Sequence, residues 1–266
     1  MTERAPQMIE VGTGAARRRV ATLIDAGAAP GLFWLSGFKS DMVSTKASAL
    51  ATWAAGKGLA CTRFDYSGHG QSEGRFEDGT ISRWLEEART VLDRLPQAPR
   101  IVVGSSMGGY IALLLLRVLM REEPAAAARI KALVLIAPAW DMTEELMWKE
   151  FPASARAAVM DQGVWLRPSL YGDPYPITRA LIEDGRRHLL GRTPWDPGRP
   201  VHIMHGLLDP DVPWEHTLEL ESVLTGGRVR VSAVPDGEHR LSRPEDLAML
   251  VSIIDGLVQV APLTSP

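Results

Sequence analysis

Two adjacent serines lie between glycines in the stretch IVVGSSMGGYIAL, residues 101–113. A serine hydroxyl is a weak nucleophile at neutral pH, so it needs a nearby base and donors for the oxyanion that its attack creates. The stretch matches the pattern Gly-x-Ser-x-Gly when Ser106 is the central serine, because Gly104 and Gly108 stand two residues away on either side. Ser105 lacks glycines at the corresponding positions. The pattern therefore indicates Ser106 as the nucleophile.

The segments around Ser106 favour the same interpretation. The apolar run RIVVG before it predicts a strand, and GYIALLLLRVLM after it predicts a helix. A sharp turn from strand to helix exposes the serine hydroxyl. The backbone N–H of Met107, at the helix start, is the expected first oxyanion donor, and the helix dipole adds to its effect. The expected second donor is the backbone N–H of Phe38, which follows Gly37 after the run LFWLSG.

Two other glycine-rich sites are excluded by spacing. A phosphate-binding loop would need a lysine after its last glycine, and none follows Gly109. A dinucleotide site would need Gly-x-Gly-x-x-Gly, but GHGQSEG has Glu73 in place of the third glycine. We interpret DYSGHGQS, residues 65–72, as a structural turn near the serine, with a contact to substrate as the alternative.

The acid that accompanies such a serine follows it along the chain, and the base comes last. The segment HGLLDPDVPW offers two aspartates directly after an apolar run. Asp209 is the preferred acid, because it lies three residues beyond Gly206. Asp211 is the alternative acid, or else a turn residue before a helix that begins near Trp214.

His239 is the expected base, because its segment VPDGEH follows the last apolar run and a loop there can bring the imidazole beside the serine. The alternative is a solvent-exposed loop histidine. The other five histidines fit less well by position: His69, His188, His202, His205 and His216. His202 and His205 lie three apart on a strand and face opposite sides, so they do not form a metal pair. No metal site is expected.

Short apolar runs alternate with longer segments of helical pattern. Most runs are continuous, as in strands buried on both faces, which predicts an α/β fold with a mostly parallel central sheet and helices on both faces. We expect strands at 32–37, 59–68, 100–106, 132–139, 201–206 and 228–237, and helices at 43–56, 79–95, 107–121, 214–225 and 243–258. Asp41 and Ser44 are candidate caps of the first helix, and Pro244 begins the last. The first 30 residues predict a β-hairpin at the sheet edge.

Residues 140–200 separate two expected strands by more than a simple crossover needs. Asp141 and Glu144 form a capping-box pattern, and further helices are expected over 152–163 and 176–190. We interpret this segment as a helical lid inserted into a single domain that spans residues 1–266. Four of the eight tryptophans lie in it, and they form either an acyl-binding pocket or the lid's own core.

Composition restricts the function further. The chain has 266 residues, of which 45% are hydrophobic and 23% charged, and its net charge is -3, so no nucleic-acid partner is expected. Arg17, Arg18 and Arg19 are interpreted as a solvated hairpin. Cys61 is the single cysteine, so no disulfide forms within the chain, and its apolar neighbours predict burial.

The N-terminal stretch lacks the apolar segment of a signal peptide. The longest apolar run, YIALLLLRVLM, is interrupted by Arg117 and is too short to span a bilayer. We therefore expect a cytoplasmic protein without stable membrane insertion. Its oligomeric state is not predicted.

Together these residues resemble the α/β-hydrolases. More narrowly, the chain resembles the family of palmitoyl-protein thioesterases and acyl-glucuronide esterases that is mitochondrial in animals, together with its bacterial homologues. The segments that carry the resemblance are SGFKSDMVSTKA (36–47), RFDYSGHGQSEGRFEDGTISRW (63–84), VGSSMGGYIALLL (103–115), GVWLRPSLYG (163–172), HGLLDPDVPW (205–214) and DGEHRLSRPEDL (236–247). The resemblance implies the same nucleophile, acid and base: Ser106, Asp209 and His239.

The resemblance also implies a serine hydrolase that cleaves acyl thioesters or carboxylic esters, without a cofactor, on a small-molecule or acylated-protein substrate. The lack of an evident transit peptide suggests a bacterial enzyme. A general carboxylesterase and a non-catalytic ligand-binding protein of the same fold are the alternatives. Carbon–carbon hydrolases and haloperoxidases share the three residue types, whereas a haloalkane dehalogenase would need a carboxylate in place of Ser106.

Overall fold

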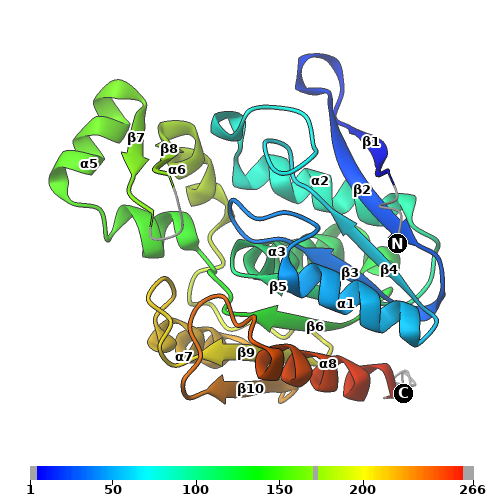
Figure 1. Ribbon diagram of the computed structural model, residues 1–266. Helices are drawn as coiled ribbons and strands as arrows, with labels where there is room; N and C mark the ends of the chain where they lie inside the picture. The colour runs from blue at the N-terminus through cyan, green and yellow to red at the C-terminus, as the bar shows by residue number, and fades with distance from the viewer. Residues whose placement is uncertain (1–4, 170–172, 260–266) are drawn as a thin grey trace.

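The computed structural model describes residues 5–169 and 173–259 of the chain. Within these ranges eight strands form one sheet in the order β1-β2-β4-β3-β5-β6-β9-β10, and the last six run parallel (Figure 1). Their bounds are Gln7–Val11 (β1), Arg18–Asp25 (β2), Ala28–Leu35 (β3), Leu59–Phe64 (β4), Arg100–Ser105 (β5), Ile130–Ile136 (β6), Val201–Gly206 (β9) and Val229–Val234 (β10). The expected mostly parallel sheet is confirmed.

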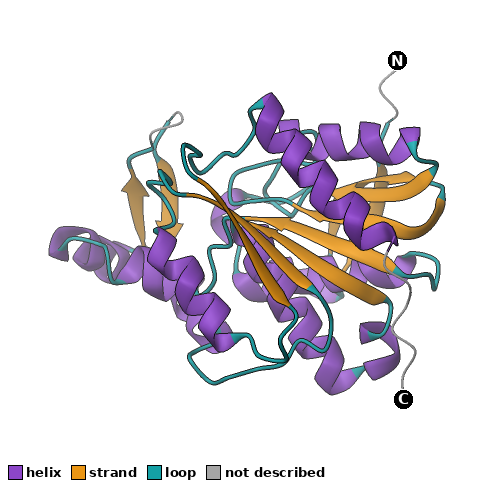
Figure 2. Ribbon diagram, turned by 90° about the horizontal axis from the view of Figure 1, so that it is seen from below, coloured by secondary structure: helices purple, strands orange, loops and turns teal. Residues whose placement is uncertain are grey.

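Helices cover both faces of this sheet (Figure 2). Along β3, Leu32 and Trp34 pack with α1 and α8 on one face, while Phe33 and Leu35 pack with α2 and α3 on the other. Both sets of side chains are buried, which explains why the strand reads as one continuous apolar run. The helices are α1 (Thr45–Gly56), α2 (Ile81–Arg94), α3 (Met107–Glu122), α4 (Pro124–Ala127), α5 (Ala153–Ala157), α6 (Arg179–Gly185), α7 (Trp214–Val223) and α8 (Pro244–Gln259).

The ends of the helices agree with the sequence only in part. Pro244 is the first residue of α8, as expected. Ser44 is the N-cap residue of α1, as expected, although its side chain makes no cap hydrogen bond. The Asp41 carboxylate accepts the Val43 N–H at 2.9 Å, within the turn that precedes the helix.

The N-terminal hairpin of β1 and β2 lies antiparallel at the sheet edge, as predicted. The solvated interpretation of the three arginines is wrong for Arg18, which is buried and forms ion pairs with Glu86 and Glu87 on α2. Arg17 and Arg19 stay exposed, as expected. Because side chains on a strand alternate between its two faces, the middle arginine points away from its neighbours and under α2.

The insertion between β6 and β9 lies to one side of the sheet in Figure 1. The expected helix over 152–163 is present as α5 followed by a π-helical turn at Ala158–Gln162. The helix expected from residue 176 begins only at Arg179, because residues Tyr175–Thr178 form strand β8, which pairs with β7 (Val164–Arg167). This hairpin was not predicted from the sequence.

Two carboxylates hold the insertion in place, one by bonds within it and one by bonds to the body of the molecule. Asp141 does not act as the expected cap; instead it accepts the N–H groups of Leu190 and Gly191 at 2.7 and 3.0 Å, and thereby joins the two ends of the insertion. Asp184 on α6 accepts the Ser82 N–H and hydroxyl at 2.8 and 2.7 Å, at the first turn of α2. The Asp184 bonds place the insertion beside α2.

Cys61 is buried, as predicted, and burial raises the pKa of its thiol to about 12. Among the described residues, no helix combines the length and apolarity needed to cross a bilayer.

Candidate active site

Ser106 lies in the turn between β5 and α3, with backbone angles of φ 53° and ψ -118°. A serine rarely adopts a positive φ, and such strain is characteristic of functional turns. The turn is possible because glycines stand on both sides. A Cβ on Gly108 would lie 2.0 Å from the Leu35 carbonyl oxygen, and one on Gly104 would lie 2.3 Å from the Gly108 carbonyl oxygen. Both glycines of the motif are therefore required by close packing.

The structure brings the three residues singled out in the sequence into contact. His239, in the loop between β10 and α8, has its Nε2 atom 3.1 Å from the Ser106 hydroxyl oxygen. Its Nδ1 atom lies 2.7 Å from Oδ2 of Asp209, which follows β9. A carboxylate only accepts, so Nδ1 carries the proton and Nε2 is free to accept the serine proton.

Of the two candidate acids, Asp209 is the one that contacts His239. Its carboxylate is fully buried, and its Oδ1 atom accepts the N–H groups of Asp211 and Val212 at 2.8 and 2.9 Å. These bonds leave Oδ2 directed at the imidazole. Asp211 thus supports the Asp209 carboxylate through its backbone.

His205 is a member of this region that the sequence analysis did not single out. Its Nε2–H donates to the Val212 carbonyl at 3.0 Å, and its Nδ1 accepts the Thr217 hydroxyl at 2.8 Å. Burial lowers its pKa, so it is neutral at pH 7 although it lies 3.9 Å from Asp209. Its position directly before Gly206, at the carboxyl end of β9, was the available signal, since functional residues gather at that edge of a parallel sheet.

The two predicted oxyanion donors lie beside the serine. Met107 is the first residue of α3, so its N–H has no acceptor in a preceding helical turn. A Cβ on Gly37 would lie 3.4 Å from the Cβ of Ser106, which places the peptide of Phe38 next to the serine. Among the described residues, neither N–H is taken by another protein group.

The segment 65–72 supports the loop that carries Phe38. Asp65 accepts the Met42 N–H at 2.6 Å and the Gln71 N–H at 2.8 Å. His69 accepts the Lys39 N–H at 3.1 Å. The segment is therefore a turn that contacts the loop after β3, as the structural interpretation expected.

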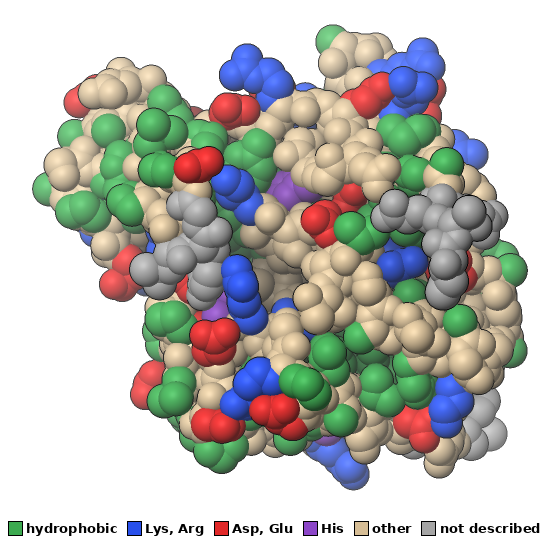
Figure 3. Space-filling model, in the orientation of Figure 1, with side chains coloured by type: hydrophobic (Ala, Val, Ile, Leu, Met, Phe, Trp, Pro, Cys, Tyr) green, Lys and Arg blue, Asp and Glu red, His purple; other side chains and the backbone are tan. Residues whose placement is uncertain are grey.

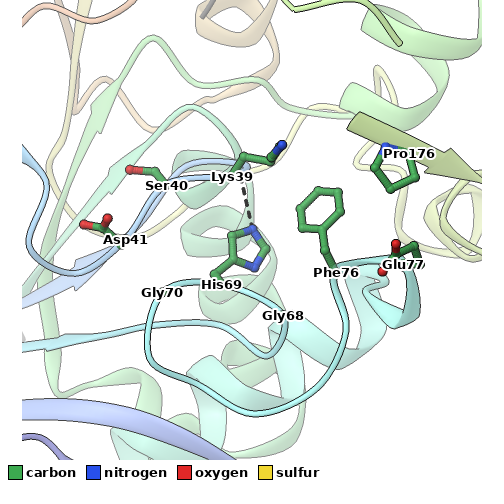
Figure 4. Close-up of a pocket in the computed structure, with 9 residues that line it drawn as sticks. All are labelled: Lys39, Ser40, Asp41, Gly68, His69, Gly70, Phe76, Glu77 and Pro176. Carbon is green, nitrogen blue, oxygen red and sulfur yellow. Dashed lines mark hydrogen bonds between the residues drawn. The ribbon is translucent and has the colours of Figure 1, made fainter. Parts of the chain in front are cut away.

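A cavity of about 250 Å³ opens beside this turn and is lined by Lys39, His69, Phe76 and Pro176, among others (Figure 4). Ser106 is not among its lining residues. Figure 3 shows the surrounding surface hollowed between the insertion and the body of the molecule. The cavity therefore borders the loop after β3 that carries Phe38, and not Ser106 itself.

Asp209, Asp211 and His239 also place three potential metal-ligand atoms within 4.8 Å of one another. Asp209 and His239 already bond to each other, and Asp209 accepts two backbone N–H groups. A metal ligated by these atoms would compete with the contacts that direct His239 at Ser106.

Comparisons with known proteins show the family to which the chain belongs. The family model Hydrolase_4, described as serine aminopeptidase, S33, matches residues 33–180. The chain is 32% identical over 234 residues to the palmitoyl-protein thioesterase ABHD10, mitochondrial, of Homo sapiens, which covers 87% of this chain and 74% of that protein. The chain is a member of the α/β-hydrolase family.

Two solved structures show how far this α/β-hydrolase resembles its relatives. A protein from Agrobacterium vitis S4 superposes with a TM-score of 0.92 at 43% identity and covers 96% of this chain and 98% of its own. The mouse α/β-hydrolase domain-containing protein 10 has a TM-score of 0.81 at 28% identity, over 95% of this chain and 98% of its own. The family places this protein among the hydrolases.

Proposed function

We propose that this α/β-hydrolase is a serine hydrolase that cleaves acyl thioesters or carboxylic esters through an acyl-enzyme intermediate. The observation that carries the proposal is the continuous set of contacts from Ser106 through His239 to Asp209, with the serine on a strained turn. A nucleophile, a base and an orienting acid in this geometry are the parts that acyl transfer needs.

In the first half-reaction the Ser106 hydroxyl oxygen attacks the acyl carbonyl carbon while His239 Nε2 takes the hydroxyl proton. The N–H groups of Phe38 and Met107 bind the resulting oxyanion. The tetrahedral intermediate collapses, the carbon–sulfur or carbon–oxygen bond breaks, and the proton on His239 is available to the leaving group. Asp209 holds the imidazole in place and stabilises its positive charge without taking the proton.

In the second half-reaction water attacks the acyl-enzyme. His239 takes a proton from the water and returns it to the Ser106 oxygen as the ester bond breaks. The carboxylic acid leaves, and the enzyme regains its starting state. No cofactor enters either half-reaction.

The substrate class is argued from the relatives and from the surface beside the acid. The curated relatives are named palmitoyl-protein thioesterases, which favours an acyl thioester. Leu207 and Leu208, directly before Asp209, are 41% and 65% exposed. Apolar side chains at this position can contact an acyl chain, and each CH₂ group buried adds about 0.8 kcal/mol.

The tryptophans of the insertion contribute less to this argument. Trp140 is buried, stacks on His216 and donates to the His216 carbonyl, while Trp165 packs against Phe151. Trp148 lies beside Arg186. These contacts favour the second interpretation, in which the tryptophans belong to the core of the insertion and its junction with the body.

The test compares matched substrates that differ in one atom and in length. Purified protein is given oxygen esters and thioesters with acyl chains from C2 to C16, with Ser106→Ala as the negative control. The proposal expects turnover that requires Ser106 and a kcat/KM for thioesters that rises with chain length. A preference for short oxygen esters would indicate a general carboxylesterase, and no turnover of either series would contradict the proposal.

A further inference from the structure

The loop after β3 adopts a conformation that it does not favour by itself. The Ser40 N–H donates to the Gly37 carbonyl at 3.1 Å, which closes a four-residue turn. Lys39, in this turn, has φ 57°. A residue with a side chain is unfavourable in that region, so contacts from outside the turn must hold it.

His69 supplies such a contact. The Lys39 N–H donates to its Nε2 atom at 3.1 Å, the bond drawn in Figure 4. The Nδ1 atom lies 3.2 Å from the Ser67 carbonyl oxygen, which can only accept. The ring therefore carries its proton on Nδ1 and presents a lone pair on Nε2 to Lys39.

The surroundings of the His69 ring keep it neutral. His69 is 4% exposed and lies among the rings of Tyr66, Phe76 and Trp84, with centroid distances of 6.0, 5.2 and 5.5 Å. Burial lowers its pKa to about 4, with a smaller contribution from the charge of Lys39. At neutral pH the ring is neutral, and the acceptor is present.

The turn of residues 37–40 also packs, through Gly37, against the turn that carries Ser106. A Cβ on Gly37 would lie 3.2 Å from the Ser105 carbonyl oxygen and 3.4 Å from the Ser106 Cβ. The peptide of Phe38 is therefore fixed between two supports: the nucleophile turn, which Gly37 approaches, and His69, which holds the next amide.

We propose that His69 is a positioning residue of the oxyanion hole, which acts by holding the Lys39 amide so that the adjoining Phe38 N–H stays directed at the oxyanion formed at Ser106. It does not touch the reacting atoms. Both of its ring nitrogens are already bonded, so it is not a second base. The inference rests on the proposed function and adds a residue to it.

The experiment compares His69→Phe, His69→Gln and His202→Leu with the wild type. Phenylalanine keeps an aromatic ring among Tyr66, Phe76 and Trp84 but removes the acceptor, whereas glutamine places an amide oxygen near the position of Nε2. His202 is the matched control, because its ring bonds only to Ser232 on the neighbouring strand among the described partners. Urea unfolding first establishes that each variant is folded, and His69→Leu replaces His69→Phe if that variant is not.

Steady-state hydrolysis and the Ki of an acyl trifluoromethyl ketone are then measured. The ketone forms an adduct whose oxyanion occupies the same hole, so it reports on the donors directly. We expect kcat of His69→Phe to fall about 10- to 100-fold with KM changed less than threefold, which is less than the loss of about 10²- to 10³-fold on removal of a whole oxyanion donor. The Ki should rise by a similar factor, His69→Gln should recover most of the loss, and His202→Leu should behave like the wild type.

A folded His69→Phe variant with kcat within twofold of the wild type would overturn the inference and leave the proposed function intact. A raised KM with unchanged kcat and Ki would also overturn it, because that result places His69 in substrate binding. Wild-type protein that neither turns over substrate nor binds the ketone would instead contradict the proposed function, and the inference with it.

Discussion

At the scale of single residues, the two aspartates after β9 have different surroundings. The Asp209 carboxylate contacts His239, whereas Asp211 contributes a backbone N–H to Asp209. We expect Asp209→Asn to lower kcat about 10⁴-fold, because an amide favours the wrong imidazole tautomer. The matched variant Asp211→Asn keeps the backbone bond and should lower kcat less than tenfold. Steady-state kinetics of the two variants measure the difference, and the reverse order would contradict the assignment of the acid.

In the proposed mechanism Ser106 and His239 act on the same proton, so the losses of activity from their substitutions should not add. Each of Ser106→Ala and His239→Ala is expected to lower kcat by about 10⁴- to 10⁶-fold, and the double variant should be hardly worse than either. Steady-state hydrolysis of a chromogenic ester gives kcat for the two single variants and the double variant. If the loss of kcat in the double variant equals the product of the two single losses, the two residues do not act as a unit.

The spacing of residues in the sequence is enough to single out Ser106, Asp209 and His239, because the chemistry fixes their order and the strand ends fix their place. It is not enough to find His69 or His205. The ring of His69 bonds to the Lys39 amide on another loop, and the ring of His205 bonds to the Val212 carbonyl beyond a turn. Only the folded chain brings these groups together.

At the scale of elements, α2 connects the edge hairpin with the turn after β4. The Glu87 carboxylate accepts from Arg18 on β2, and also from the Ser67 hydroxyl and N–H at 2.6 and 2.9 Å. Its side chain is 0% exposed, whereas that of the adjacent Glu86, which binds the same arginine, is 48% exposed.

Glu87→Ala should therefore lower the free energy of unfolding by about 3–5 kcal/mol, because it leaves a buried guanidinium without its main partner. Glu86→Ala removes a half-exposed carboxylate while Arg18 keeps Glu87, and it should cost about 0–1 kcal/mol. Urea unfolding followed by circular dichroism compares the two variants. Equal losses would mean that burial of the ion pair does not matter for stability.

The sequence predicts the strands and long helices of the body well, because continuous apolar runs and helical periodicity are strong signals. It predicts the insertion poorly. Residues 175–178 carry Tyr, Pro, Ile and Thr, and they form strand β8 only because β7 is there to pair with them. The sequence also does not predict the burial of Arg18, because that burial depends on the packing of α2 over β2.

At the scale of the whole molecule, burial lowers the pKa of five histidines: His69, His188, His202, His205 and His216. The unfolded chain takes up protons on these rings below about pH 6.5, while the folded protein takes them up only at lower pH. The free energy of unfolding is therefore not reduced by these histidines above pH 6.5, and it falls as the pH decreases below that value.

His69, whose pKa is lowered to about 4, should account for a large part of this loss. The wild type should lose stability between pH 7 and pH 5, and His69→Gln should lose about 2 kcal/mol less over that interval, because glutamine does not titrate. Urea unfolding at both pH values tests this. An identical loss in both proteins would show that His69 is not held neutral by the fold.

The account as a whole depends on an activated serine at position 106. The most direct measurement treats the purified protein with a fluorophosphonate and maps the modified peptide by mass spectrometry, in the wild type, Ser105→Ala, Ser106→Ala and His239→Ala. The account predicts label on Ser106 in the wild type and in Ser105→Ala, and none in Ser106→Ala or His239→Ala. Absence of label from the folded wild type, or label that persists in His239→Ala, would contradict it.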